Sequence, residues 1–326
     1  MQALLSKISP APLLLLLLLI AMPWLAQASG MEYYIGVLTR MLIFAMLASS
    51  LNFLLGYGGM VSFGHAVFFG IGAYVTAIAV FHGLTNAWLV WLLAAAASAL
   101  AGLIIGAIAL RTRAVYFIMI TMALAQLFYY FFVGLRYYGG DDGLQMAQRP
   151  GIGFGLDIRG DNGFYWLVLS WLTATLLLLA LLLRSRFGLA LNAIRQNERR
   201  AEAVGYPSLR YKLAAFVMAA IIAGLAGSLI GMHNLFVSPK LLHWSQSGML
   251  LVMVALGGVG YFYGGVLGAA VFLALEEVLS SHVEYWQIYV GVVLLAVVML
   301  APRGISSLLR MGKSSQSLEQ GESHGA

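Results

Sequence analysis

The sequence predicts an all-α, polytopic integral membrane bundle of about eight to ten transmembrane segments, some of them broken by glycines. Of its 326 residues, 62% are hydrophobic and 9% are charged, whereas soluble globular proteins carry roughly 25% charged residues. The apolar runs are long enough to cross a bilayer as helices, and they lack the alternation of a membrane β-strand. No stretch has the composition of a separate soluble domain.

The first 32 residues predict an N-terminal transmembrane segment with the character of a signal peptide. Lys7 precedes a leucine-rich run, and Ala26 and Ala28 flank Gln27 in the pattern of a cleavage site. The segment is therefore either cleaved or retained as a first span. We favour retention because the topology derived below works better with it.

Residues 33–304 form the predicted transmembrane domain, and residues 305–326 form a predicted disordered cytoplasmic tail because they are rich in Ser, Gly and Glu. With the N-terminal segment, the apolar segments fall at 11–28, 33–56, 61–81, 87–110, 114–134, 164–183, 212–236, 248–259, 264–281 and 285–301.

Charge indicates the orientation of these segments. The loop 184–212 carries seven basic and two acidic residues, a net +5 out of +6 for the whole chain. Such loops lie in the cytoplasm, so the charge indicates membrane topology and not nucleic-acid binding. Simple alternation then places the N-terminus inside and the segment 135–163 outside. Splitting 248–281 at Gly257–Gly265 brings the C-terminus inside as well, and it puts Glu276, Glu277 and Glu284 near the outer side.

The segment LLGYGGMVSFGHAVFFGIGAY, from Leu54 to Tyr74, contains six glycines. Gly70 and Gly72 are expected to let helices approach closely, and the small residues around Gly224 and Gly227 predict a second helix of the same kind.

Gly56–Gly59 instead predict a break in the helix. Together with Gly257–Gly265, this break matches the paired interruptions expected near a transporter's pathway, although a plain turn would use glycine too. The residues predicted for a substrate pathway are Gly58, Gly59, Ser62 and His65. His65 has two open interpretations: a structural hydrogen bond to a neighbouring helix, or a role in the pathway.

The basic loop predicts a short amphipathic helix along the cytoplasmic face, over about residues 188–205. Leu191, Ile194, Ala201 and Val204 make its apolar stripe, and Gly205 stops it. Its partner is either anionic lipid at the membrane surface or a cytoplasmic protein.

The sequence has no features that would make the chain an enzyme. It contains no cysteine, no clear metal-binding constellation and no nucleophile–base pair, so we expect neither catalysis nor a bound cofactor. Arg40 and Glu276 lie toward the ends of their spans, and no pair of carboxylates lies in the core of a span. Selectivity is therefore expected mainly from another subunit.

Several motifs in order resemble the permease subunits of ABC importers for branched-chain amino acids, of the LivM type. They are LNFLLGYGGMVSFGHAVFFGIGAY from Leu51, GGDDGL from Gly139, RSRFGLALNAIRQNERRAEAVGYPSLRYKLAAF from Arg184, VSPKLLHWSQSGMLLVMVALGGVG from Val237, GGVLGAAVFLALEEVLS from Gly264 and APRG from Ala301. The resemblance covers about residues 33–304. It departs from the family at Met249 and at Phe262–Gly265, which leaves the substrate open.

This resemblance implies a bacterial inner-membrane protein that works with a homologous second permease. It also implies two cytoplasmic ATPases that hydrolyse the ATP, and a periplasmic or surface-tethered binding protein that delivers substrate. The ATPase-docking loop would comprise Arg195, Glu198, Arg199, Glu202, Ala203 and Gly205. The alternative function from another class is a self-contained channel or facilitator for a small neutral solute such as urea.

Overall fold

The computed structural model describes residues 19–24, 33–153, 160–282, 285–300 and 304–306. These residues are mainly helical, as predicted, and the predicted apolar segments each correspond to a helix. Of the first segment, only the helical residues 19–24 are described, and they pack on α7: the Tyr165 hydroxyl donates to the Leu19 carbonyl at 2.8 Å. The longer helices are α3 (Tyr33–Asn52), α4 (His65–Phe81), α5 (Ala87–Ala109), α6 (Val115–Gly134), α7 (Asp161–Arg184), α10 (Ser208–Asn234), α11 (Trp244–Gly257), α12 (Gly264–His282) and α13 (Trp286–Leu300).

Short elements connect these helices. A π-helical turn, η1 (Phe53–Tyr57), continues α3, and α8 (Arg186–Gln196) and α9 (Glu198–Ala203) lie between α7 and α10. Two short strands, β1 (Leu144–Gln145) and β2 (Phe236–Val237), pair antiparallel. The 3₁₀ turns η2 (Arg136–Tyr138) and η3 (Pro239–Leu242) complete the connections. In the described part of the chain, six helices are long and apolar enough to cross a membrane, and the apolar helices α4 and α11 are shorter. The chain is therefore a multi-pass membrane bundle.

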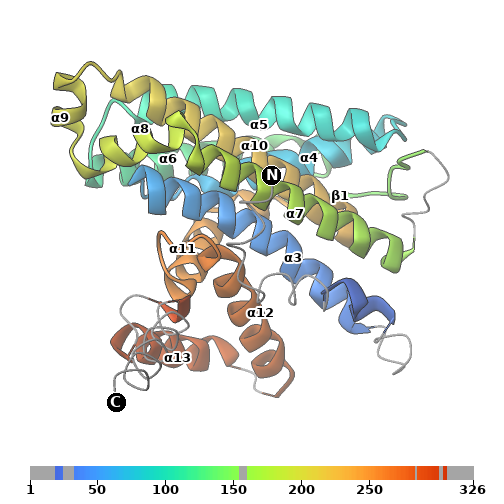
Figure 1. Ribbon diagram of the computed structural model, residues 1–326. Coiled ribbons are helices and arrows are strands. Elements are labelled where there is room, and N and C mark those ends of the chain that lie inside the picture. Colours follow the sequence, from blue (N-terminus) through green and yellow to red (C-terminus); the bar gives the residue numbers. More distant parts are fainter. Residues whose placement is uncertain (1–18, 25–32, 154–159, 283–284, 301–303, 307–326) are drawn as a thin grey trace, which may run out of the picture.

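Two helices form the centre of this bundle. Helix α10 packs against α4, α5 and α3, and α3 also packs against α7 and α12. Both α3 and α10 are buried over most of their length, whereas α6 and α7 expose most of theirs. In Figure 1, α3, α5, α7 and α10 run in roughly the same direction, and α11, α12 and α13 form a group along one side of them.

The contact between α4 and α10, which we call the glycine seam, brings two helix backbones together. A side-chain carbon added to Gly72 would overlap the carbonyl oxygen of Gly224, and one added to Gly227 would overlap that of Phe69. Across the same seam, the Thr76 hydroxyl donates to the Ser228 hydroxyl at 2.6 Å. Small residues therefore pack these helices as the sequence predicts for a membrane interior.

The connections gather at two ends of the bundle. The basic end carries α8 and α9, and the strand end carries the β1–β2 pair and a bridge between Asn86 and Gly151 (Figure 1). Successive connections between the long helices lie at opposite ends of the bundle. This matches the alternating direction of the spans that the sequence predicts.

Three boundaries differ from the sequence predictions. Ser62 lies before α4 and not within it, because the helix begins at His65. The helix predicted over 188–205 is two helices, since Asn197 has an extended backbone and its side-chain oxygen accepts from the Arg200 amide at 3.0 Å, starting α9. The predicted tail begins too early, because residues 305 and 306 are helical. Residues 307–326 lie outside the described part.

Candidate functional site: a glycine junction at the basic end

Helix α3 ends at the basic end in a loosened turn. Residues Phe53–Tyr57 form a π-helix, and Gly59 follows with a φ of +68°, a conformation that side-chain-bearing residues rarely adopt. π-helical turns within helices occur frequently at functional sites. The predicted break at Gly56–Gly59 is therefore present, and it takes the form of a widened final turn followed by a reversal.

The second predicted glycine interruption contacts the first one. Helix α11 ends at Gly257, and Gly258 and Gly260 have φ values of +110° and +79° before α12 begins. A carbon added to Gly56 would lie 2.6 Å from both the Cα and the amide nitrogen of Gly260. Two segments that lie about 200 residues apart in the sequence thus meet backbone to backbone.

Asn52 holds this meeting point together. Its side-chain Nδ2 donates to the Tyr261 carbonyl at 2.7 Å, and its Oδ1 accepts from the Gly260 amide at 3.0 Å. The side chain is buried, so both hydrogen bonds form away from solvent. A single amide side chain near the end of α3 therefore fixes the turn between α11 and α12.

Arg195 brings α8 to the same place. Its Nη1 donates to the carbonyl oxygen of Gly56, and its Cγ lies 3.1 Å from where a side-chain carbon on Gly59 would be. We call the group formed by Asn52, Gly56, Gly59, Arg195 and Gly260 the glycine junction. Helix α8, at the basic end, is thereby hydrogen-bonded to the point where the two interrupted segments touch.

The chain after α13 returns to the junction as well. The Ser306 hydroxyl donates to the Gly257 carbonyl, and a carbon added to Gly304 would lie 2.4 Å from the Cα of Gly258. Both residues are buried. The start of the predicted tail is therefore part of the folded bundle.

The predicted docking residues have different surroundings. Leu191, Ile194 and Ala201 are buried as the stripe predicted, but Val204 is 74% exposed, because Asn197 divides the helix and turns α9. Arg199, Ala203 and Gly205 are exposed, and the Glu202 carboxylate accepts from the Ser208 hydroxyl. Other large apolar side chains exposed in this region are Leu189, Tyr206 and Leu209.

Glu198 supports the fold of the predicted docking loop. Lys212 donates to its carboxylate at 2.6 Å. Desolvation alone would raise the pKa of the Glu198 carboxyl, but the hydrogen bond and the charge of Lys212 outweigh it and hold this pKa below its usual value. The pair connects α9 to the first turns of α10.

The predicted pathway residues do not share one surface. Gly59 is exposed at the basic end, whereas Ser62 and His65 are fully buried. The Ser50 hydroxyl donates to the Leu47 carbonyl at 2.7 Å, so the 2.8 Å contact between Ser50 Oγ and His65 Nε2 has the histidine as donor. This geometry favours the structural interpretation of His65. No group of three His, Asp or Glu residues able to hold a metal ion occurs in the described part of the chain.

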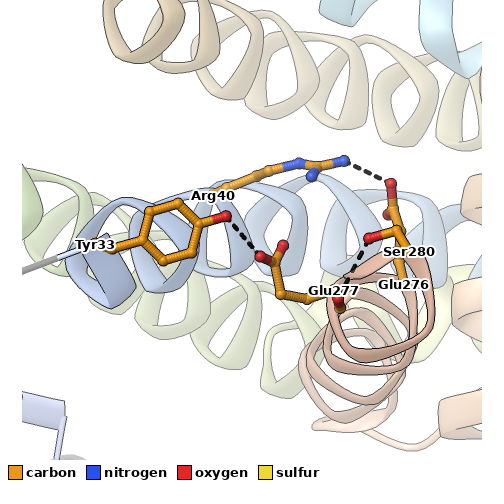
Figure 2. Close-up of polar contacts among 5 residues, drawn as sticks. All are labelled: Tyr33, Arg40, Glu276, Glu277 and Ser280. Carbon is orange, nitrogen blue, oxygen red and sulfur yellow. Dashed lines mark hydrogen bonds and ion pairs between the residues drawn. The ribbon is translucent and has the colours of Figure 1, made fainter. Parts of the chain in front are cut away.

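A charged group at the strand end was missed by the sequence analysis. Figure 2 shows Arg40 of α3 paired with Glu276 of α12 at 3.0 Å, and the Tyr33 hydroxyl donating to Glu277 at 2.7 Å. Glu284, predicted to join these acidic residues, lies outside the described part. The sequence carried no signal for this pairing, because helices distant in sequence bring the opposite charges together here.

The fold and the glycine junction define a multi-pass membrane protein of the transport-permease class. Residues 33–301 match the family described as branched-chain amino acid transport system, permease component, and the chain belongs to that family.

Curated relatives agree with this family. The high-affinity branched-chain amino acid transport system permease protein LivM of Salmonella typhimurium is 27% identical over 98% of this chain and 80% of its own length, and LivM of Escherichia coli K12 is 26% identical over the same shares. LivH of Salmonella typhimurium is 25% identical over 80% of this chain and 90% of its own length. No solved structure gives a significant match.

Proposed function

We propose that this chain is one of two permease subunits of an ATP-driven importer for branched-chain or related amino acids. The family supports this assignment, as do the two kinds of related permease protein, LivM and LivH, that the chain resembles. The basic end would face the cytoplasm of a bacterial inner membrane, and a binding protein would deliver substrate to the strand end. The excess of arginine and lysine at the basic end supports this orientation.

The ATP would be hydrolysed by two cytoplasmic ATPase subunits docked on α8 and α9. Leu189, Val204 and Leu209 are exposed at the same end as the exposed Arg199. An apolar surface rimmed by charges is typical of a protein interface. Because α8 and α9 lie at one end of the bundle, a subunit bound there would leave the membrane-facing helices free.

The single observation that carries the proposal is the hydrogen bond from Arg195 to the Gly56 carbonyl. A displacement of α8 by the ATPase would pull on the end of α3 and on the adjoining turn at Gly260. Gly59, Gly258 and Gly260 already have positive φ angles, and glycine changes its backbone conformation more readily than other residues. The glycine junction would therefore convert a movement at the surface into a rearrangement of α3, α11 and α12.

The proposal predicts that Arg195→Ala uncouples transport. In the complex of this chain with its second permease, ATPases and binding protein, we expect uptake of L-leucine to fall about tenfold or more, since a charge-assisted hydrogen bond of this kind is lost. ATP hydrolysis and the melting temperature should change little. Arg210→Ala, which removes one exposed charge from the same end, is the matched control and should leave uptake intact.

Two results would overturn the proposal. Wild-type uptake by Arg195→Ala would remove the coupling role of the glycine junction. Flux of urea or leucine through this chain reconstituted alone, with no ATP, would instead favour the self-contained facilitator.

A further inference from the structure

A cavity of about 470 Å³ lies at the strand end, away from the glycine junction. Its walls come from α3, α7, α10 and α12, and they include Tyr33, Val37, Arg40, Asp161, His233 and Glu277. Tyr33 and Asp161 are largely exposed, so the cavity is open at the surface of the bundle. Its volume lies within the usual range for small-molecule sites.

The cavity presents one cation and two carboxylates. Arg40 donates one N–H to Glu276, and a guanidinium has five N–H donors. Glu277 receives the Tyr33 hydroxyl on Oε1, and Asp161 receives Arg149 on Oδ1. Arg40 can therefore still donate to an anion, and each carboxylate keeps a second oxygen for a cation.

The remaining wall suits an apolar group. Val37 lies one turn from both Tyr33 and Arg40 on the same face of α3. Gly36 has no side chain, and a carbon placed there would lie 3.9 Å from Cε1 of His233. Any residue other than glycine at position 36 would therefore narrow the space between α3 and α10.

We propose that this cavity is a reception site for a free α-amino acid. Arg40 binds the carboxylate, Glu277 and Asp161 hold the ammonium, and the side chain lies toward Val37. A zwitterion can interact with Arg40 and with the two carboxylates at once, whereas a neutral solute such as urea offers no charge to either, so the cavity favours a zwitterion. The ligand class follows from the cavity itself, whereas a role in receiving imported substrate rests on the proposed function.

Binding to the purified full chain in detergent tests the ligand class. L-leucine, isopentylamine and 4-methylpentanoate share the isobutyl side chain, and the last two carry a single charge each. Saturation-transfer NMR and calorimetry should show weak binding of L-leucine, and each single-charge analogue should bind about tenfold more weakly, as expected when one charged hydrogen bond is lost. Equal binding of all three compounds would overturn the proposal.

Substitutions test the site. Glu277→Gln preserves an acceptor for the Tyr33 hydroxyl, and Arg40→Lys preserves a charge for Glu276; each should weaken L-leucine binding about tenfold. Asp142→Asn removes an exposed carboxylate from the same end, outside the cavity, and should leave binding unchanged. The inference is wrong if Asp142→Asn weakens binding as much as Glu277→Gln does, or if Glu277→Gln keeps full affinity at an unchanged melting temperature.

The binding experiment can fail while the proposed function holds, and the reverse is also possible. Binding to the isolated chain needs neither ATP nor another subunit. ATP-driven uptake by a complex whose Glu277→Gln chain binds L-leucine normally would reject the cavity and retain the importer. L-leucine binding at the cavity without any ATP-driven uptake would retain the cavity and reject the importer.

Discussion

The glycine seam and the glycine junction use the same residue in opposite ways. In the seam, Gly72 and Gly227 have ordinary helical backbones and serve only to remove side chains from between α4 and α10. In the junction, Gly59 and Gly260 have positive φ angles and let the chain reverse. The seam joins two long regular helices along their length, whereas the junction joins interrupted ends. A glycine-rich membrane segment can therefore contain both a close contact between helices and a reversal of the chain.

The largest loss of stability is expected from a substitution in the glycine seam. Gly72→Ala places a carbon on the Gly224 carbonyl oxygen, so the two helices must separate, at a cost of about 3 kcal/mol or more. The purified variant should melt at a markedly lower temperature or aggregate on size-exclusion chromatography in detergent.

Gly291→Ala is the matched control for the seam. Gly291 lies inside α13 with nothing within 4 Å of an added carbon, and alanine is the better helix former by about 0.8–1.0 kcal/mol. This variant should be as stable as the wild type or slightly more so. If both alanine variants melt alike, backbone contact does not hold α4 and α10 together.

A smaller effect is expected at the junction. Asn52→Ala removes the hydrogen bonds to the Tyr261 carbonyl and the Gly260 amide, each contributing about 1 kcal/mol. We expect a loss of about 2 kcal/mol in the free energy of unfolding, below that of the seam variant, measured by thermal denaturation. Asn192→Ala, at an exposed position on α8, is the control. A loss larger than that of Gly72→Ala would reverse the comparison.

The smallest effect concerns the ion pair that supports the predicted docking loop. Glu198→Gln should cost about 0.5 kcal/mol at pH 7, because the pair with Lys212 is partly exposed. The pKa of Glu198 is lower in the folded protein, so its stabilisation is complete above the usual glutamate pKa of about 4.3. It is lost as the pH falls through the lowered pKa. Melting curves of the wild type and Glu198→Gln should therefore converge only in acid, and a constant difference down to pH 3 would exclude this pair as its source.

Much of the fold was predictable because length and hydropathy define membrane helices. The division of 248–281 also followed from charge, since the positive-inside bias required an added crossing at Gly257–Gly265, and α11 and α12 confirm it.

Other features depended on side-chain direction or on distant contacts. Asn197, a favoured N-cap residue followed by Glu198, was a signal for the break between α8 and α9 that the apolar stripe concealed. Arg195 was predicted only as a docking residue, because nothing in a sequence states that an arginine reaches a backbone carbonyl. Arg40 and Glu276 are 236 residues apart, and only the packing of α3 on α12 joins them.

The bond from Arg195 to Gly56 also has a genetic consequence. A salt bridge between two side chains can be restored by a compensating change in its partner, but a carbonyl oxygen is present whatever residue occupies the position. Selection for recovered uptake in an Arg195→Ala strain should therefore not yield suppressors that act through a new side chain at position 56, where any added carbon meets Gly260. Such suppressors are expected in α8, where another long donor can reach the same oxygen.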